Sequence, residues 1–254
     1  MAADSTPVRL LQITDTHLFA EPGKTLYGVN TRQSLQSVLD AAVRRPKPGL
    51  VLVTGDLVHD QPPPAYQALA DMLRQLSVPV AVIAGNHDEL KDLHTVTGAG
   101  IRVGGVHALG KWRIVLLNTL VSGKIAGHLD KSELEFLETA LRAASDSPVL
   151  IALHHQPVPV GSAWLDRIAL DNADEFFDVV DRAGNVRGVL WGHVHQAFES
   201  RHREVRLLAA PSTCAQFLPG SKDFALDSRS PGMRWLTLHA DGRIETQIEW
   251  VEKL

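Results

Sequence analysis

Five short segments of this sequence place aspartate, asparagine or histidine residues directly after apolar runs. These side chains bind metal ions through oxygen and nitrogen. The set contains no thiolate, which disfavours a structural zinc site and suits manganese, iron, cobalt or zinc in hydrolytic roles. A site that holds two such ions most often hydrolyses phosphate esters. The segments are Asp15-Thr16-His17, Gly55-Asp56, Gly85-Asn86-His87-Asp88, His154-His155 and Gly192-His193-Val194-His195.

The spacing within these segments allows neighbouring side chains to share an ion. Asp15 and His17 are two residues apart, so both face the same way on an extended strand, and His193 and His195 have the same spacing. Asp56 follows a glycine, which permits a sharp turn, and a carboxylate has two oxygens that can bridge two cations. Each motif alone is ordinary, but five of them at successive strand ends predict one shared metal site.

The elements that must position these segments alternate between strands and helices. Apolar runs predict strands that end at or near the segments, and helical periodicity between the first three strands predicts crossover helices and a parallel sheet. The carboxyl ends of parallel strands share one edge, where ligand sites form. The expected strands are 8–13, 50–53, 78–84, 112–118, 149–153 and 186–191.

Helix signals lie between and after these strands. Thr31 is a plausible N-cap for a helix with an apolar stripe, and a helix over 64–76 has a proline near its start. Residues 130–133 have the form of a capping box, and Asp171 or Asn172 is expected to cap the next helix.

The last part of the chain has a different pattern. Residues 205–209, 233–239 and 244–251 alternate like antiparallel strands, and Asp241-Gly242 is a hairpin signal between the last two. No internal repeat or linker is visible, so residues 1–254 are expected to form a single domain.

Composition excludes several classes of protein. The chain has 254 residues, 44% of them hydrophobic, which is typical of a globular protein with a full core. The net charge of −4 argues against a nucleic-acid partner. Cys214 is the single cysteine, no run approaches the length of a membrane span, and residues 1–7 lack the features of a signal peptide. We therefore expect a soluble cytoplasmic protein with no membrane partner; its oligomeric state stays open.

The chain resembles the calcineurin-like metallophosphoesterase family over essentially its whole length. Residues 11–19 and 153–157 carry this resemblance. Residues 161–166 and 212–217 are more narrowly similar to the bacterial class III cyclic-AMP phosphodiesterases. The resemblance implies an α/β fold, a four-layer αββα sandwich of two mixed β-sheets flanked by helices.

The resemblance also implies roles for nine residues of the five segments. The ligands of the first metal would be Asp15, His17, Asp56 and His195, and Asp56 would bridge to a second metal held by Asn86, His154 and His193. His87 would be the catalytic residue beside the scissile phosphate, and substrate would contact His17, Asp56, Asn86 and His87. His155 would support a ligand instead of binding metal. The metal-binding tyrosine of purple acid phosphatases is missing, so no charge-transfer colour is expected.

The implied cofactor is two divalent or trivalent metal ions per chain. Iron and manganese are the expected metals, with zinc and cobalt as alternatives. Two such ions outweigh the charge of Asp15 and Asp56, so the site would attract an anionic phosphodiester. The metals would activate a shared water to attack phosphorus, and His87 would protonate the leaving alkoxide or stabilise its charge.

The favoured function is hydrolysis of a small cyclic nucleotide, 3′,5′-cyclic AMP, to 5′-AMP. One alternative is the same chemistry on another ester, such as a glycerophosphodiester or a monoester. The other is a non-catalytic binding scaffold, against which the complete ligand set argues. Trp164 or Phe217 could provide an apolar face for the base or be packing residues. The remaining histidines are expected at the surface or in local hydrogen bonds: His59, His94, His107, His128, His202 and His239.

Overall fold

The computed structural model describes residues 6–60, 63–93, 97 and 100–252; His94 and the first residues of the N-terminal segment lie outside them. Within the described part, two six-stranded mixed sheets form the centre of the molecule. The first sheet has the order β16 (Ile244–Trp250), β15 (Gly232–Leu238), β1 (Val8–Ile13), β4 (Leu50–Thr54), β5 (Val80–Ile83) and β6 (Ile101–Val103). The second has the order β11 (Phe198–His202), β12 (Val205–Ala209), β10 (Val186–Trp191), β9 (Val149–Ala152), β8 (Trp112–Leu116) and β7 (Gly105–Leu109).

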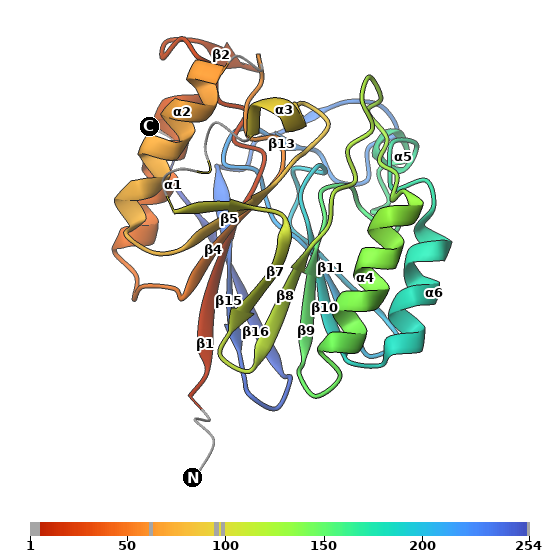
Figure 1. Cartoon of the computed structure of the whole chain (residues 1–254). Helices are drawn as coiled ribbons and strands as arrows, with labels where there is room; N and C mark the ends of the chain where they lie inside the picture. The colour runs from red at the N-terminus through yellow and green to blue at the C-terminus, as the bar shows by residue number, and fades with distance from the viewer. Residues whose placement is uncertain (1–5, 61–62, 94–96, 98–99, 253–254) are drawn as a thin grey trace.

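Helices cover the outer face of each sheet. Figure 1 shows α1 (Thr31–Val43) and α2 (Pro63–Leu73) on one side and α4 (Lys131–Ala143) and α6 (Ala173–Ala183) on the other. The short elements are η1 (Arg74–Leu76), α3 (Leu90–Leu93), α5 (Ala163–Asp166), and the strand pairs β2 (Thr25–Leu26) with β3 (Val29–Asn30) and β13 (Gln216–Phe217) with β14 (Leu226–Asp227).

Three hydrophobic clusters correspond to the three interfaces between four layers. One lies between the sheets and contains Leu52, Trp112 and Leu150. The other two lie under the helices, with Leu35 of α1 in one and Phe176 of α6 in the other. Burial of this apolar surface is the main force that holds the layers together. The four-layer αββα sandwich expected from the sequence is confirmed.

One buried cation links the two sheets. Arg234 of β15 is fully buried. Its guanidinium donates to Glu199 Oε1 (2.8 Å) on β11 and to the carbonyl of Ala209 (2.8 Å) on β12. A buried arginine is tolerated only when its donors are paired, so this contact fixes the edge of one sheet against the other.

The predicted strands are found with end shifts of a few residues, with one error of direction. Residues 205–209 form β12, which is antiparallel to β11 but parallel to β10. The prediction of an antiparallel strand is therefore only half right there. The Asp241-Gly242 hairpin between β15 and β16 is confirmed. Three strands of the two large sheets, β6, β7 and β11, were not predicted, because their apolar alternation is short or weak, and neither were the four two-residue strands of the described part.

One predicted helix cap is wrong, and another, Asn172, is at the N-cap position of α6 but lacks the cap hydrogen bond. Asn30, not Thr31, caps α1: its Oδ1 accepts from the N–H of Gln33 (3.0 Å), and Thr31 is the first helical residue. Asn172 precedes α6 but makes no cap hydrogen bond. Its amide instead pairs with the backbone of Leu129.

The capping box of α4 is half formed. Asp130 accepts a hydrogen bond from the N–H of Glu133 (2.9 Å), as predicted. The Glu133 carboxylate accepts from the N–H of Asn118 (3.2 Å), the residue that follows β8 by two positions. The helix start is thus tied to the second sheet.

Among the described residues, no helix has the length and apolar character needed to cross a bilayer.

Candidate metal centre

The five segments identified in the sequence meet at one end of the sandwich. They follow β1, β4, β5, β9 and β10, whose carboxyl ends lie at the top of Figure 1. Backbone hydrogen bonds tie the segments together: the N–H of Asp15 donates to Gly55 O (3.0 Å), and that of His17 donates to Asp56 O (2.9 Å). The N–H of Gly192 donates to His154 O (3.2 Å), which joins two segments of the second sheet.

The backbone at these segments is unusual. Eight non-glycine residues in the described part have positive φ, and five of them are Asp15, His17, Asp56, His193 and His195. This left-handed conformation is costly for residues with a Cβ and persists where the surroundings impose it, often at functional sites. The turns aim successive side chains into one space, so the simple picture of alternating side chains on an extended strand does not describe this site.

Glycines make room for the close approach of the segments. A Cβ on Gly55, which has φ +95°, would collide with the His154 ring. A Cβ on Gly85 would collide with Asp56. The glycines of the motifs therefore serve the packing of candidate ligands against each other.

The first group of donor atoms comes from the segments after β1, β4 and β10. His17 Nε2 lies 3.1 Å from His195 Nε2 and 3.7 Å from Asp56 Oδ2. His195 Nε2 lies 3.4 Å from Asp15 Oδ1. Asp15, His17 and His195 each offer an atom within 4.8 Å of the others. These are the donors expected for the first ion.

The second group shares Asp56 with the first. His154 Nε2 lies 3.4 Å from Asp56 Oδ1 and 3.3 Å from Asn86 Oδ1. The His193 ring lies 5.1 Å from the His154 ring, centroid to centroid. The two oxygens of Asp56 therefore face different groups, Oδ2 the first and Oδ1 the second, which is the arrangement that a bridging carboxylate needs.

Backbone carbonyls orient three of the histidines. The Nδ1–H groups of His154 and His195 donate to Thr54 O (2.8 Å) and Ala215 O (2.7 Å). The Nε2–H of His193 donates to Ile168 O (3.1 Å). Each bond keeps the proton on the bonded nitrogen and leaves the lone pair of the other ring nitrogen available to a metal ion. Such partners fix the tautomer of metal-binding histidines. His154 and His195 thus present Nε2, and His193 presents Nδ1.

The charge states of these side chains suit a cation. Burial lowers the pKa of His17 and of His193 to about 3, so both rings are neutral, as ligands must be. Burial would raise the pKa of Asp56, but His154 and His17 hold it well below its usual range. Burial would lower the pKa of His154, but Asp56 raises it to about 9. Without metal the His154 ring therefore holds a proton near neutral pH, which a metal ion at its Nε2 would displace, whereas His17 and His193 are already neutral.

His87 lies beside these two groups, and with His17 and His59 it forms a further set of ring nitrogens within 4.8 Å of one another. Its backbone N–H donates to Asp56 Oδ1 (2.9 Å), which anchors the turn after β5. Its ring contacts the His17 ring edge-on (5.0 Å between centroids) and stacks on His59 (4.9 Å, 24° between planes). It lines a cavity of about 200 Å³ that His17, Asp56 and Asn86 also line. A substrate in this cavity meets the metal donors and His87 together.

His155 and Asp88 are buried next to the centre. His155 is buried next to His154 and His193, but Thr119 Oγ1 (2.7 Å) and Ile125 O (2.9 Å) contact its two ring nitrogens. Its nitrogens also lie within 4.8 Å of those of His154 and His193, so its role as a support instead of a ligand stays a prediction. Asp88 is buried and accepts from the N–H groups of Leu57, Val58 and Gly85 and from the Tyr66 hydroxyl, which joins the turns after β4 and β5.

Sequence reasoning missed part of this site. His59 was expected at the surface or in a local hydrogen bond, but its ring stacks on His87 and its Nδ1 lies 3.4 Å from His17 Nδ1. Tyr27 and Phe224 were not singled out, although both line the cavity. The position of His59 three residues after Asp56 was the signal available for it.

The other histidines behave as expected where the structure describes them. His107 contacts Gly104 O, His128 pairs with Asp171, and His202 pairs with Asp181. His239 pairs with Glu245 at the far end of β15. These residues lie outside the donor groups.

Comparison with known proteins places this geometry in a family. Residues 8–197 match the family described as Calcineurin-like phosphoesterase. The chain is 41% identical over 251 residues to the 3′,5′-cyclic adenosine monophosphate phosphodiesterase CpdA of Pseudomonas aeruginosa, covering 98% of this chain and 92% of that protein. It is also 41% identical to CpdA of Escherichia coli K12 (97% and 90% covered) and 38% identical to a 3′,5′-cyclic-nucleotide phosphodiesterase of Nostoc (98% and 94%).

Solved structures share the fold at low sequence identity. A dimetal phosphatase from Danio rerio aligns with a TM-score of 0.65 and 18% identity, covering 97% of this chain and all of that one. A purple acid phosphatase from yellow lupin aligns with a TM-score of 0.68 and 13% identity, covering 98% of this chain and 52% of that one. At these identities the likeness concerns the fold alone.

Proposed function

Because the chain belongs to the calcineurin-like phosphoesterase family, we propose that it is a metal-dependent phosphodiesterase that hydrolyses 3′,5′-cyclic AMP to 5′-AMP. The observation that carries this proposal is the pair of donor groups joined at Asp56, with His87 at their edge in a shared cavity. Relatives named as cyclic-nucleotide phosphodiesterases, which align over nearly the whole chain, support the choice of substrate.

We assign the seven candidate ligands to two ions. Asp15, His17 and His195 would hold the first ion, and Asn86, His154 and His193 would hold the second, with Asp56 shared. When bound, the metals supply a nucleophile at neutral pH and stabilise negative charge on the phosphoryl oxygens. Iron and manganese are the metals we propose, with zinc and cobalt as alternatives, and the sulfur-free donor set suits all four without choosing among them.

The protein's own side chains position the phosphodiester for attack. The cavity brings the phosphate next to His17, Asp56 and Asn86, and it brings the leaving 3′-oxygen to His87. His87 protonates that oxygen or stabilises its charge, and its backbone bond to Asp56 keeps the imidazole at a fixed place relative to the donors. Buried surroundings exclude water from all but the open side, which strengthens these electrostatic contacts.

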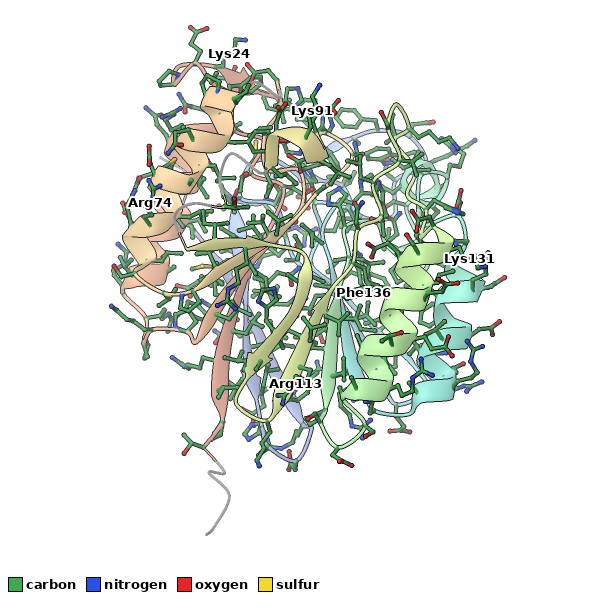
Figure 2. All side chains as sticks on the ribbon, viewed as in Figure 1. Lys24, Arg74, Lys91, Arg113, Lys131 and Phe136 are labelled. Carbon is green, nitrogen blue, oxygen red and sulfur yellow. The ribbon has the colours of Figure 1, made fainter. Side chains whose placement is uncertain are left out.

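Side chains of both charges surround the candidate site. Lys91 and Lys124 line a larger cavity of about 570 Å³ that adjoins the first at Asn86, His87 and Ile125. Figure 2 shows Lys24 and Lys91 at the end where the candidate site lies, and Arg113 at the opposite end. Asp88 and Glu89 line the same cavity and Lys24 pairs with Asp60, so the lysines do not act alone, and the attraction of an anionic phosphodiester would come mainly from two bound metal ions.

The larger cavity favours a second candidate function. It could accept the second alcohol of a linear diester, such as a glycerophosphodiester, on the other side of His87. A cyclic nucleotide has no such separate group, because both ester oxygens belong to one ribose. The two functions use the same donors and differ in which cavity holds the rest of the substrate.

A substrate panel separates these functions. Purified protein is loaded with manganese, and kcat/KM is measured for cyclic AMP, cyclic GMP, a glycerophosphodiester and a phosphomonoester at equal metal content. We expect cyclic AMP to give the highest value and 5′-AMP as its product. Formation of 3′-AMP, or a much higher value for the glycerophosphodiester, would contradict the proposal. No turnover of any ester would favour a binding scaffold.

A further inference from the structure

Four aromatic side chains from three separate loops gather at the mouth of the cavity. Tyr27 comes from the turn between β2 and β3, Trp164 from α5, and Phe217 and Phe224 from the β13–β14 hairpin and its loop. Ring centroids are 5.1 Å apart for Trp164 and Phe217, 5.4 Å for Trp164 and Phe224, and 5.2 Å for Tyr27 and Phe224. We call these four residues the aromatic cluster.

The aromatic cluster is attached directly to the candidate metal centre. The Phe217 ring stacks on the imidazole of His195, with 4.1 Å between centroids and 11° between planes. His195 is one of the donors of the first group, so the aromatic cluster is in direct contact with the candidate metal ligands. A molecule whose phosphate lies at the donors therefore reaches the cluster with whatever group is attached next to that phosphate.

The cluster is open to a ligand. Tyr27 and Phe224 are each 48% exposed, which is high for large aromatic side chains, whereas Phe217 is buried. Tyr27 has φ 50°, a conformation that costs free energy and is held here by its surroundings. Exposed aromatic rings beside a cavity are typical of a surface that a flat apolar group covers.

The lining favours an uncharged aromatic group over other occupants. Among the described residues, no lysine, arginine or glutamate lines this cavity, and its one carboxylate is Asp56 on the metal side. At about 200 Å³ the space is small, which suits one ring system of a small molecule better than a peptide segment. Nucleobases bind to such rings by stacking, which tolerates any base because each has a π-face.

We propose that the aromatic cluster is a nucleobase subsite in which Tyr27 and Phe224 hold the base of the substrate by ring contact while Trp164 and Phe217 form its floor. This inference rests on the proposed function, because it places the base relative to a phosphate bound at the metal donors. It predicts a preference for a cyclic nucleotide over a small linear diester, and little discrimination between adenine and guanine.

The test compares substrates that differ only in the base. The variants Tyr27→Ala and Phe224→Ala are assayed with cyclic AMP and with the abasic ribose 3′,5′-cyclic phosphate. Loss of one stacking contact should raise KM for cyclic AMP ~10-fold in each variant and leave kcat/KM for the abasic compound within ~2-fold. Tyr27→Phe and Phe224→Tyr, which keep the rings, should behave like the unmodified protein.

Two further measurements keep this result interpretable. Leu218→Ala is the matched control, because Leu218 is exposed next to Phe217 but does not line the cavity. Binding of adenosine, which has no phosphate, is measured by calorimetry and should weaken in both alanine variants and not in the control. Equal loss for cyclic AMP and the abasic compound, or unchanged adenosine binding, would overturn the subsite. Failure of the unmodified protein to hydrolyse cyclic AMP would instead overturn the proposed function.

Discussion

The imidazole of His59 stacks on that of His87, with 4.9 Å between ring centroids and 24° between planes. His59 also lies with its Nδ1 3.4 Å from Nδ1 of His17. One side chain thus contacts both the proposed catalytic residue and a proposed metal ligand. Contacts of this kind orient reactive groups and commonly change metal affinity or turnover when they are removed.

Two substitutions of His59 separate its contacts. His59→Phe keeps a ring against His87 but removes the nitrogen near His17, so metal affinity should fall ~10-fold with kcat at saturating metal nearly unchanged. His59→Ala removes both contacts and should lower kcat as well. Metal affinity is measured by competition with a chelator. His202→Ala is the control, because His202 stacks on Phe177 away from the site; equal effects in the control would contradict the assignment.

Substitution of His87 tests its chemical role. His87→Ala should retain two metal ions but slow turnover ~10²–10⁴-fold, as expected for loss of a general acid. Its backbone bond to Asp56 does not depend on the side chain, which is why the donors should remain in place. Normal turnover of cyclic AMP, or a collapse of metal content in elemental analysis, would show that the role is wrong.

Asp88 should affect metal affinity by holding the turns that carry the candidate ligands Asp56 and Asn86. Its two oxygens accept from three backbone N–H groups and from Tyr66, and an asparagine would replace one oxygen with a donor. Asp88→Asn should weaken metal binding ~10–100-fold through the turn that carries Asn86. Tyr66→Phe removes two hydrogen bonds, the one to Asp88 and the one that the hydroxyl accepts from the N–H of Glu89, and should cost about 2 kcal/mol of unfolding free energy. Unchanged metal affinity in Asp88→Asn would contradict this role.

The contact between Glu199 and Arg234 makes stability depend on pH. Burial would raise the pKa of Glu199, but Arg234 and Arg206 hold it below the usual value of 4.5. The unfolded chain therefore binds a proton at Glu199 more readily than the folded chain does. The contribution of the Glu199–Arg234 contact to the free energy of unfolding is full above pH 4.5, and it is lost as pH falls through the lower pKa of Glu199 in the folded state.

Urea-induced unfolding of Glu199→Gln measures this effect. Because the carboxylate is half exposed, the loss near neutral pH should be modest, about 1 kcal/mol. The difference from the unmodified protein should shrink at acidic pH, where Glu199 is protonated in both states. A difference that stays constant with pH would show that charge is not the cause.

Much of the fold was predictable because its signals are local. The strands that end at the five segments are apolar runs followed by motif residues, and the glycines of those motifs mark where the chain must turn. β6, β7 and β11 escaped prediction because pairing with a neighbouring strand, not their own composition, makes them strands. Asn30 displaced Thr31 as the cap of α1 because an asparagine one residue earlier satisfies the same N–H.

The candidate donors could be proposed from the sequence, but their surroundings could not. Motif spacing indicates which residues share an edge of the sheet, and the structure brings all seven together there. His59 and the aromatic cluster come from loops far apart in the sequence, without a periodic pattern. These residues come together only when the two sheets pack, and a single sequence does not predict which loops that packing brings into contact.

Reconstitution of metal-free protein tests the central claim most directly. Manganese is added in increasing equivalents, and the rate of 5′-AMP formation from cyclic AMP is followed by chromatography. With Asp56 shared between two donor groups, we expect no product without metal and a rate that reaches its plateau at two ions per chain. Full activity without metal, or a plateau at one ion, would contradict a two-metal phosphodiesterase.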